Sequence, residues 1–219
     1  MVKRVAMSLM ALCLVAATVA WTGAGTAMSS TVRYSHTWSP PLNLASSYRP
    51  CCSSKAGFTT LPFTMTVSGS QGFNLGVRMR TNWVDTKAVG DTPNIIQQGR
   101  YGKPSLIKIS IHSGVNPGAH HAQCRITANG VTVNVAGPKN IDVADGRWHY
   151  IVCIKFPDTA SGTDVRVTVD GVLGPIVHTS ERLGSIVFTN DAVDLGGQGP
   201  IANKDSIDGS YEYVVFTTA

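Results

Sequence analysis

The chain has 219 residues, a formal net charge of +5 and only 14% charged residues, with glutamate at two positions, Glu181 and Glu212. Glycine is abundant, valine and threonine are frequent, and good helix formers are scarce after the first 25 residues, which is typical of an all-β domain rich in turns. The modest charge forms no basic run, which argues against nucleic-acid binding as the main role.

The N-terminus has the layout of a secretory signal peptide. A basic pair precedes an apolar run over residues 5–21, and small residues follow it. Cleavage after Ala27 or Ala24 fits this layout. An uncleaved membrane anchor is the alternative, because these 17 residues lie at the lower end of the roughly 17–25 that span a bilayer. We expect residues 1–27 to be a signal peptide and the protein to be secreted or held at the cell surface.

Residues 28–57 form a leader rich in serine and proline, and residues 58–219 carry dense strand signals. We expect the leader to be partly ordered, and an edge strand around residues 31–38 is compatible with its sequence. The body contains short alternating segments without a convincing helix, spaced as in a sandwich or barrel. The strands expected in the body cover 63–67, 73–79, 94–98, 107–111, 122–127, 131–135, 148–156, 165–169, 186–188, 193–195 and 211–216.

Glycine-containing dipeptides mark tight turns between these segments. The three that precede or join the expected strands are Asn129-Gly130, Asp145-Gly146 and Asp170-Gly171. Tight hairpins need φ > 0 in the turn, and Asn-Gly and Asp-Gly pairs adopt it readily. Asp208-Gly209 opens the last expected strand in the same way.

Four segments of the body carry a family resemblance. They are Asp145-Gly-Arg-Trp-His-Tyr-Ile-Val-Cys, Val167-Thr-Val-Asp-Gly-Val, Asp194-Leu-Gly-Gly and Ile207-Asp-Gly-Ser-Tyr-Glu-Tyr-Val. They resemble laminin G-like domains of the concanavalin A-like lectin and glucanase superfamily, in the form found in secreted bacterial proteins. The resemblance covers residues 58–216. It implies an all-β jelly roll of two antiparallel sheets, and binding more often than catalysis.

Two adjacent residues of this signature receive structural interpretations. Trp148 is predicted to fill the core, because a ring of that size buries a large apolar area. His149 points to the opposite face of the same strand. We interpret His149 as a structural histidine with satisfied hydrogen bonds rather than as a catalytic group.

Four cysteines follow the signal peptide, and secretion makes disulfides chemically sensible. Four cysteines allow three pairings, and the residues alone do not choose among them. The resemblance implies Cys124–Cys153, because similar secreted domains carry a cysteine pair at matching places. Closing that loop stabilises a fold by about 3–4 kcal/mol. Cys51 and Cys52 are then left to form a vicinal disulfide, to stay free or to pair between chains.

The chain lacks the carboxylate pair that glucanases of this superfamily use. Those enzymes place two glutamates a few residues apart on one strand, with the carboxyl groups about 5–5.5 Å apart for retention. Here Glu181 and Glu212 lie 31 positions apart. No Gly-x-Ser-x-Gly nucleophile elbow occurs either. We therefore predict that the protein is not an enzyme.

Two metal sites come into question. His120-His121 is interpreted as a solvated loop pair, because neighbours on a strand point to opposite faces and no further transition-metal ligands are evident. The resemblance implies calcium at the rim of the sandwich, held by hard oxygen ligands. Asp85 and Asp91 are the predicted calcium ligands, and each also fits a capped turn.

The calcium prediction departs from the family pattern at one point. The loop over residues 103–105 contains no acid where the resemblance implies a ligand. Asp205 and Asp208 are a second option for the ion. Calcium is therefore the expected cofactor, with the rim loop over residues 82–94 as the better candidate for its site.

Carbohydrate binding requires an exposed aromatic ring beside polar groups that bond hydroxyls. Trp83 can supply such a ring, although it also fits a core position at a strand end. The predicted ligand-binding residues are Trp83, Asp85, Asn94 and Tyr101. The rim loops over residues 82–94 and 113–121 would carry the contacts.

Three hypotheses for function follow. The leading one is a secreted or cell-surface, non-catalytic module that recognises extracellular carbohydrate or a surface protein. The second is a structural cell-envelope protein without a small ligand, oligomerising through its leader. The third is a divergent glycan hydrolase. Stable membrane insertion after signal cleavage is not expected.

Overall fold

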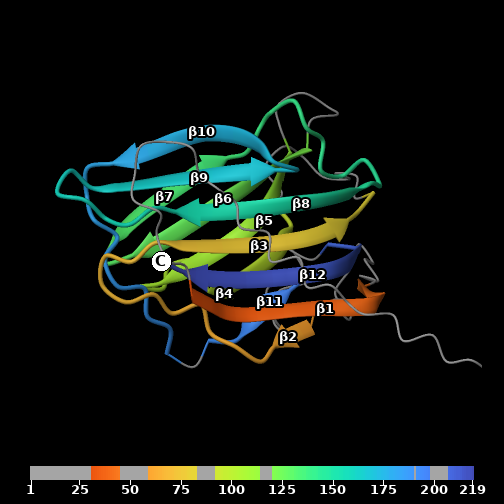
Figure 1. Cartoon of the computed structure of the whole chain (residues 1–219), viewed down its shortest axis with the longest axis horizontal. Helices are drawn as coiled ribbons and strands as arrows, with labels where there is room; N and C mark the ends of the chain where they lie inside the picture. Colours follow the sequence, from red (N-terminus) through yellow and green to blue (C-terminus); the bar gives the residue numbers. More distant parts are fainter. Residues whose placement is uncertain (1–30, 45–58, 83–91, 114–119, 190, 198–206) are drawn as a thin grey trace, which may run out of the picture.

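The computed structural model describes residues 31–44, 59–82, 92–113, 120–189, 191–197 and 207–219. The regular secondary structure of these residues consists of β-strands alone (Figure 1). Two six-stranded antiparallel sheets form a jelly-roll sandwich, which confirms the predicted fold class. Sheet A has the spatial order β1 (Thr31–Leu44), β12 (Gly209–Thr218), β3 (Phe73–Arg80), β8 (Trp148–Lys155), β9 (Thr163–Val169), β10 (Val172–Thr179). Sheet B has the order β2 (Thr59–Leu61), β11 (Val193–Leu195), β4 (Asn94–Gly99), β5 (Leu106–Ser113), β6 (His120–Ala128), β7 (Val131–Ala136).

Strand β1 lies in the segment expected to be a leader. It forms one edge of sheet A and pairs with β12 from Thr31↔Thr218 to Leu44↔Gly209. The edge strand expected around residues 31–38 is therefore present and runs further. Cys51 and Cys52 lie outside the described residues. The described part of the chain contains no helix long and apolar enough to cross a membrane.

Two of the expected strands are wrong, and two observed strands, β2 and β10, were not expected. Residues 63–67 and 186–188 form no strand and contribute only the isolated bridge Val67↔Ile186. Strand β10 was missed because Pro175 interrupts its alternation. β10 is the second edge of sheet A, where a residue without an N–H costs no ladder hydrogen bond on the outer side.

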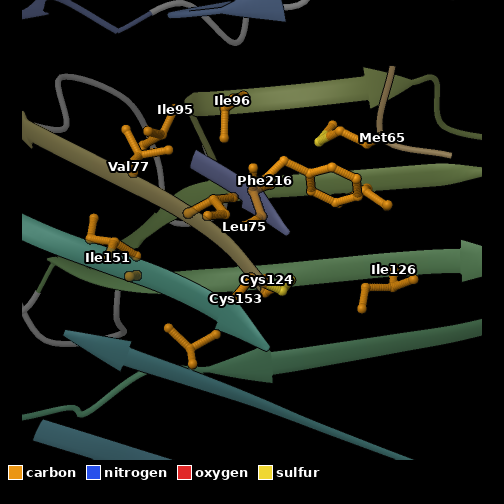
Figure 2. Close-up of a cluster of buried hydrophobic side chains, with 14 of the residues drawn as sticks. Met65, Leu75, Val77, Ile95, Ile96, Cys124, Ile126, Ile151, Cys153 and Phe216 are labelled. Atoms are coloured by element: carbon orange, nitrogen blue, oxygen red, sulfur yellow. A yellow bond between two sulfur atoms is a disulfide. The ribbon is translucent and has the colours of Figure 1, made fainter. Parts of the chain in front are cut away.

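The hydrophobic core lies between the two sheets. Alternate residues point inward in strands such as β6, β7 and β8, as the period of two in the sequence predicts, whereas β4 is buried at every position. Figure 2 shows Leu75, Val77 and Ile151 of sheet A in one cluster with Ile96 and Ile126 of sheet B. All five side chains are fully buried. One contiguous core therefore holds the sheets together.

A disulfide crosses this core. Cys124 of β6 and Cys153 of β8 are bonded, with their Cα atoms 5.8 Å apart (Figure 2). The pairing implied by the family resemblance is confirmed. Since β6 belongs to sheet B and β8 to sheet A, the bond ties the two layers covalently.

Two of the predicted glycine turns are confirmed as tight hairpins, whereas at Asp145-Gly146 only the glycine has positive φ and Gly209 does not have it. Asn129 has φ 50° and Gly130 has φ 81°, and these two residues join β6 to β7. Asp170 has φ 52° and Gly171 has φ 81°, and these two join β9 to β10. Positive φ at both positions is the signature of the tight hairpin turn that matches strand twist.

A buried ion pair stands at the end of β8. Lys155 Nζ lies 2.7 Å from Asp158 Oδ1, and both side chains are 0% exposed. Lys155 Nζ also donates to the Gln71 carbonyl (2.8 Å). Asp158 accepts from Thr163 Oγ1 (2.6 Å) and from the Gly184 amide (2.7 Å). Burial lowers the pKa of Lys155, while its bond to Asp158 acts in the opposite direction.

Candidate functional site

A shallow groove lies on the outer side of sheet B, between the turn that follows β4 and the β6–β7 hairpin. Its volume is about 530 Å³, which falls in the range of roughly 300–1,000 Å³ found for ligand sites. The side chains that give the groove its chemistry are those of Tyr101, Lys103, Pro104, Arg125, Thr127 and Thr132.

The turn after β4 raises Tyr101 from the sheet. Gly99 and Gly102 have φ of 82° and 78°, so the backbone reverses within a few residues. The Lys103 amide donates to the Arg100 carbonyl (3.1 Å) and closes the turn. A Cβ at Gly99 would collide with the carbonyl oxygen of Ser105, so this position requires glycine.

Tyr101 is the aromatic residue that lines the groove, and its side chain is 75% exposed. The Arg125 guanidinium lies over its ring, with Cζ 4.7 Å from the centroid, in a cation–π arrangement. The contact orients the ring while leaving most of its surface in solvent. The predicted binding residue Tyr101 therefore lies in a groove with polar neighbours.

Two threonines supply hydroxyl groups beside this pair. Thr127 of β6 and Thr132 of β7 face each other across the hairpin, with their Oγ1 atoms 2.9 Å apart. Each hydroxyl can donate once and accept twice, so their mutual bond leaves capacity for a ligand. The groove thus combines a ring, two hydroxyls and two cations, Lys103 and Arg125.

The structure does not bring the other predicted binding residues to this groove. Asn94 lies at the opposite end of β4, is fully buried and donates from Nδ2 to Gln97 Oε1 (2.7 Å). Trp83, Asp85 and Asp91 lie outside the described residues. No cluster of three metal-ligating side chains occurs among the residues that are described, and calcium binding stays a prediction.

The prediction that Trp148 fills the core is wrong. Trp148 is half-buried on the outer face of sheet A, where Arg78 and Arg80 lie over its ring at 5.7 and 5.2 Å from the centroid. The reason is strand parity, because Ile151 and Cys153 of the same strand point into the core. The arginines of the neighbouring strand cover the ring instead.

A second, smaller hollow opens at the rim of the sandwich. Its volume is about 460 Å³, and its lining includes Arg80, Asn43 and Ser210. These side chains already bond one another: Arg80 Nε donates to Ser210 Oγ (3.3 Å), which donates to Asn43 Oδ1 (2.6 Å). Among the described residues that line it there is no aromatic ring. The groove at Tyr101 is therefore the better candidate for ligand binding.

His149 is held between two carboxylates. Its Nδ1 lies 2.7 Å from Asp170 Oδ2, its Nε2 lies 2.9 Å from Asp145 Oδ1, and its side chain is 8% exposed. Two acceptors require a proton on both ring nitrogens, which is the charged imidazolium. Burial is the largest influence and lowers the pKa of His149, but the bonds to Asp145 and Asp170 together raise it above its ordinary value. These bonds fit the interpretation of a satisfied structural histidine.

This cluster predicts a loss of stability in mildly alkaline solution. The pKa of His149 is higher in the folded protein than in the unfolded chain, where it is about 6.5. The protonated ring therefore stabilises the fold fully below about pH 6.5, and this stabilisation is lost as the pH rises through the folded pKa. Urea unfolding between pH 6 and pH 9 should show the decline. His149→Gln should flatten it, whereas His178→Gln, which alters a 51% exposed side chain, should not. An unchanged slope in His149→Gln would show that the cluster is not the source.

The interpretation of His120-His121 as a solvated loop pair is also wrong. Strand β6 already begins at His120, and His121 is buried. The His121 ring lies 5.1 Å from that of His112 on the neighbouring strand. His120 Nδ1 lies 3.4 Å from Asp142 Oδ1. The two rings therefore take part in separate contacts.

Lys103, Arg125, Thr127 and Thr132 were not predicted as binding residues. Arg125 is 24 positions from Tyr101, and only the pairing of β4, β5 and β6 brings them together. One signal in the sequence points to them: residues 92–141 contain five lysines and arginines and no aspartate or glutamate.

The chain matches no protein-family model, and no curated protein matches it. Among solved structures it is similar to domains LG4-5 of the mouse laminin alpha1 chain, with a TM-score of 0.51 and 13% identity over 74% of this chain and 40% of that chain. It is also similar to the Ruminococcus gnavus IT-sialidase CBM40 (TM-score 0.46, 13% identity, 84% of this chain and 90% of that one). A third similar structure is the alginate lyase Aly36B (TM-score 0.43, 10% identity, 70% and 71%). The laminin likeness supports the laminin G-like jelly-roll fold, and this chain spans about two-fifths of that laminin chain.

Proposed function

We propose that the protein is a non-catalytic carbohydrate-binding module, secreted or held at the cell surface, whose ligand binds in the groove at Tyr101. The observation that carries this proposal is the exposed Tyr101 ring, 75% accessible in a groove lined by hydroxyl and cationic groups. The apolar face of a sugar ring stacks on an aromatic side chain, while its hydroxyls need hydrogen-bond partners nearby.

The polar groups of the groove suit the hydroxyls of a sugar. Thr127 and Thr132 can donate and accept, and Lys103 and Arg125 donate only. The cation–π contact with Arg125 holds the Tyr101 ring in place before the ligand arrives. A ring that is already oriented loses less conformational freedom on binding, which favours affinity.

The arrangement of the glutamates favours binding over hydrolysis. Glu212 pairs with Arg78 on sheet A, with Oε2 3.0 Å from Nε. Glu181 is an exposed residue just after β10. Neither contributes to the groove at Tyr101. A glycosidase would need two carboxyl groups facing each other across one cleft, about 5–9.5 Å apart.

The proposal predicts that Tyr101→Ala abolishes most of the binding. A glycan array probed with the purified protein should give a signal that weakens about tenfold in the variant, equivalent to roughly 1.4 kcal/mol. Tyr101→Phe keeps the ring and serves as the matched control. Because Tyr101 is largely exposed, the thermal midpoint should not change in either variant.

The same array should be run with calcium and with chelator. Loss of the signal on chelation would support the predicted ion site at Asp85 and Asp91, and an equal signal would remove calcium from the account. The absence of every glycan signal in both conditions would count against the module and favour the structural cell-envelope alternative.

A further inference from the structure

One half of sheet B is built from a segment without acidic residues. The segment 92–141 contains no acidic residue, although the chain has 13 in total. Strands β4, β5, β6 and β7 all lie in that segment and are consecutive neighbours in sheet B. The cations of the segment are Arg100, Lys103, Lys108, Arg125 and Lys139. The outer side of this half of sheet B is therefore built without a carboxylate of its own.

Arg125 is central to this surface. It lies directly across from Lys108 in the β5–β6 register, and like charges in such positions destabilise a sheet. No carboxylate within the described part of the chain pairs with Arg125. Its Nε is buried and has no hydrogen-bond partner there. Within the described part of the chain the guanidinium lies over the Tyr101 ring, and its Nε donor is unused.

Lys103 adds a second cation to the same groove. It is exposed in the turn after β4, on the side where Tyr101 stands. An ammonium and a guanidinium in the same groove as an aromatic ring would attract an anionic group and repel a cationic one. Arginine in particular presents parallel N–H donors that match the two oxygens of a carboxylate or sulfate.

We propose that the ligand of the groove is an acidic polysaccharide, a claim that rests on the proposed carbohydrate-binding function. The sugar ring stacks on Tyr101, and the carboxylate or sulfate of the same or the next residue binds Arg125 and Lys103. The oxyanion supplies acceptors to the Arg125 guanidinium, for which the described residues provide no carboxylate.

Nucleic acid is the other common polyanion, and the groove suits it less well. Single-strand binding relies on several aromatic rings on which successive bases stack, along a basic channel. Here one exposed ring, Tyr101, stands in the groove, and the described residues that line the groove include no second aromatic ring for a neighbouring base. The threonine hydroxyls beside it match sugar hydroxyls.

Matched polymers test the charge of the ligand directly. Polygalacturonate and its methyl-esterified form share a backbone, as do dextran sulfate and dextran, so each pair differs only in the oxyanion. Binding of the purified protein is measured by titration calorimetry at low and physiological salt, with polyuridylate as the nucleic-acid comparison. We expect at least about tenfold preference for one acidic member over its neutral partner, and weaker binding at higher salt.

Charge-removing variants locate the contact. Arg125→Gln and Lys103→Gln should each weaken binding of the preferred acidic polymer about tenfold, the loss typical of a hydrogen bond to a charged group. Lys139→Gln removes the same charge from an exposed position of the same acid-free segment, outside the groove, and should stay within about twofold. Thermal melts of the three variants confirm that each is folded.

Each outcome has a distinct meaning. Equal binding of acidic and neutral partners would overturn the acidic ligand and leave carbohydrate binding standing. Failure of every polysaccharide would overturn the proposed function as well. Tighter binding of polyuridylate than of any polysaccharide, or equal losses in Arg125→Gln and Lys139→Gln, would also overturn this inference.

Discussion

Lys155→Met is expected to lower the free energy of unfolding by about 3–5 kcal/mol, the usual cost of removing one partner of a buried ion pair. Asp158 would remain fully buried without its cation, held only by the Thr163 hydroxyl and the Gly184 amide. Urea denaturation at pH 7, followed by tryptophan fluorescence, measures the change. Lys139→Met, an exposed substitution of the same type, should stay within about 0.5 kcal/mol of the wild type.

The double variant Lys155→Met, Asp158→Asn distinguishes the cost of burying an unpaired charge from the coupling energy of the ion pair. With both charges gone, no uncompensated ion is buried, so this variant should be more stable than Lys155→Met alone. A double-mutant cycle then gives the coupling energy of the two side chains. If Lys155→Met unfolded within about 1 kcal/mol of the wild type, the buried pair would not have the role assigned to it.

Removing the disulfide is the second large effect. Replacing both Cys124 and Cys153 with alanine should cost about 3–4 kcal/mol, because the 29-residue separation sets the loop entropy that the bond removes from the unfolded chain. Both side chains are fully buried, so lost packing adds to that cost. Urea unfolding of the oxidised wild type and of the double variant gives the difference.

The reduced wild type is the control for packing. It keeps both sulfur atoms in the core but lacks the bond, so its stability should fall between those of the oxidised protein and the double variant. An oxidised protein that unfolds at the same urea concentration as the double variant would show that the sheets are not cross-linked in solution.

Much of the fold could be predicted because alternation within a strand and the residues of a tight turn are properties of short sequence segments. Alternating residues predicted most strands, since a period of two places every second side chain in the core. Asn129-Gly130 and Asp170-Gly171 predicted their hairpins because their φ values are a local property. Strand β10 was missed for the converse reason: Pro175 breaks the pattern, and only its position at the sheet edge makes it acceptable.

The error at Trp148 could have been avoided from the sequence. The implied bond to Cys124 requires Cys153 to point into the core, and residues two and four positions earlier must then point inward as well. Those residues are Ile151 and His149, and both are buried. Trp148 has the opposite parity. The size of a side chain was therefore a poorer guide to burial than its register with a cysteine.

The groove was harder to predict than the fold. Tyr101 stands out in the sequence as an aromatic residue in a glycine-containing turn, but Arg125 reaches it only through the register of two further strands. Cross-strand pairing of that kind has no signature within a single segment. The absence of acids from residues 92–141 was visible, and it becomes meaningful once the strands are known to be neighbours.

The central claim is that ligand binds at Tyr101 and Arg125, and hydrogen exchange with and without a saturating acidic polysaccharide tests it most directly. We expect exchange to slow in the peptides that cover residues 99–105 and 125–132, which surround the groove. Exchange at the rim hollow, residues 80–82 and 208–210, should not change. Protection at the rim hollow with none in the groove would contradict the account.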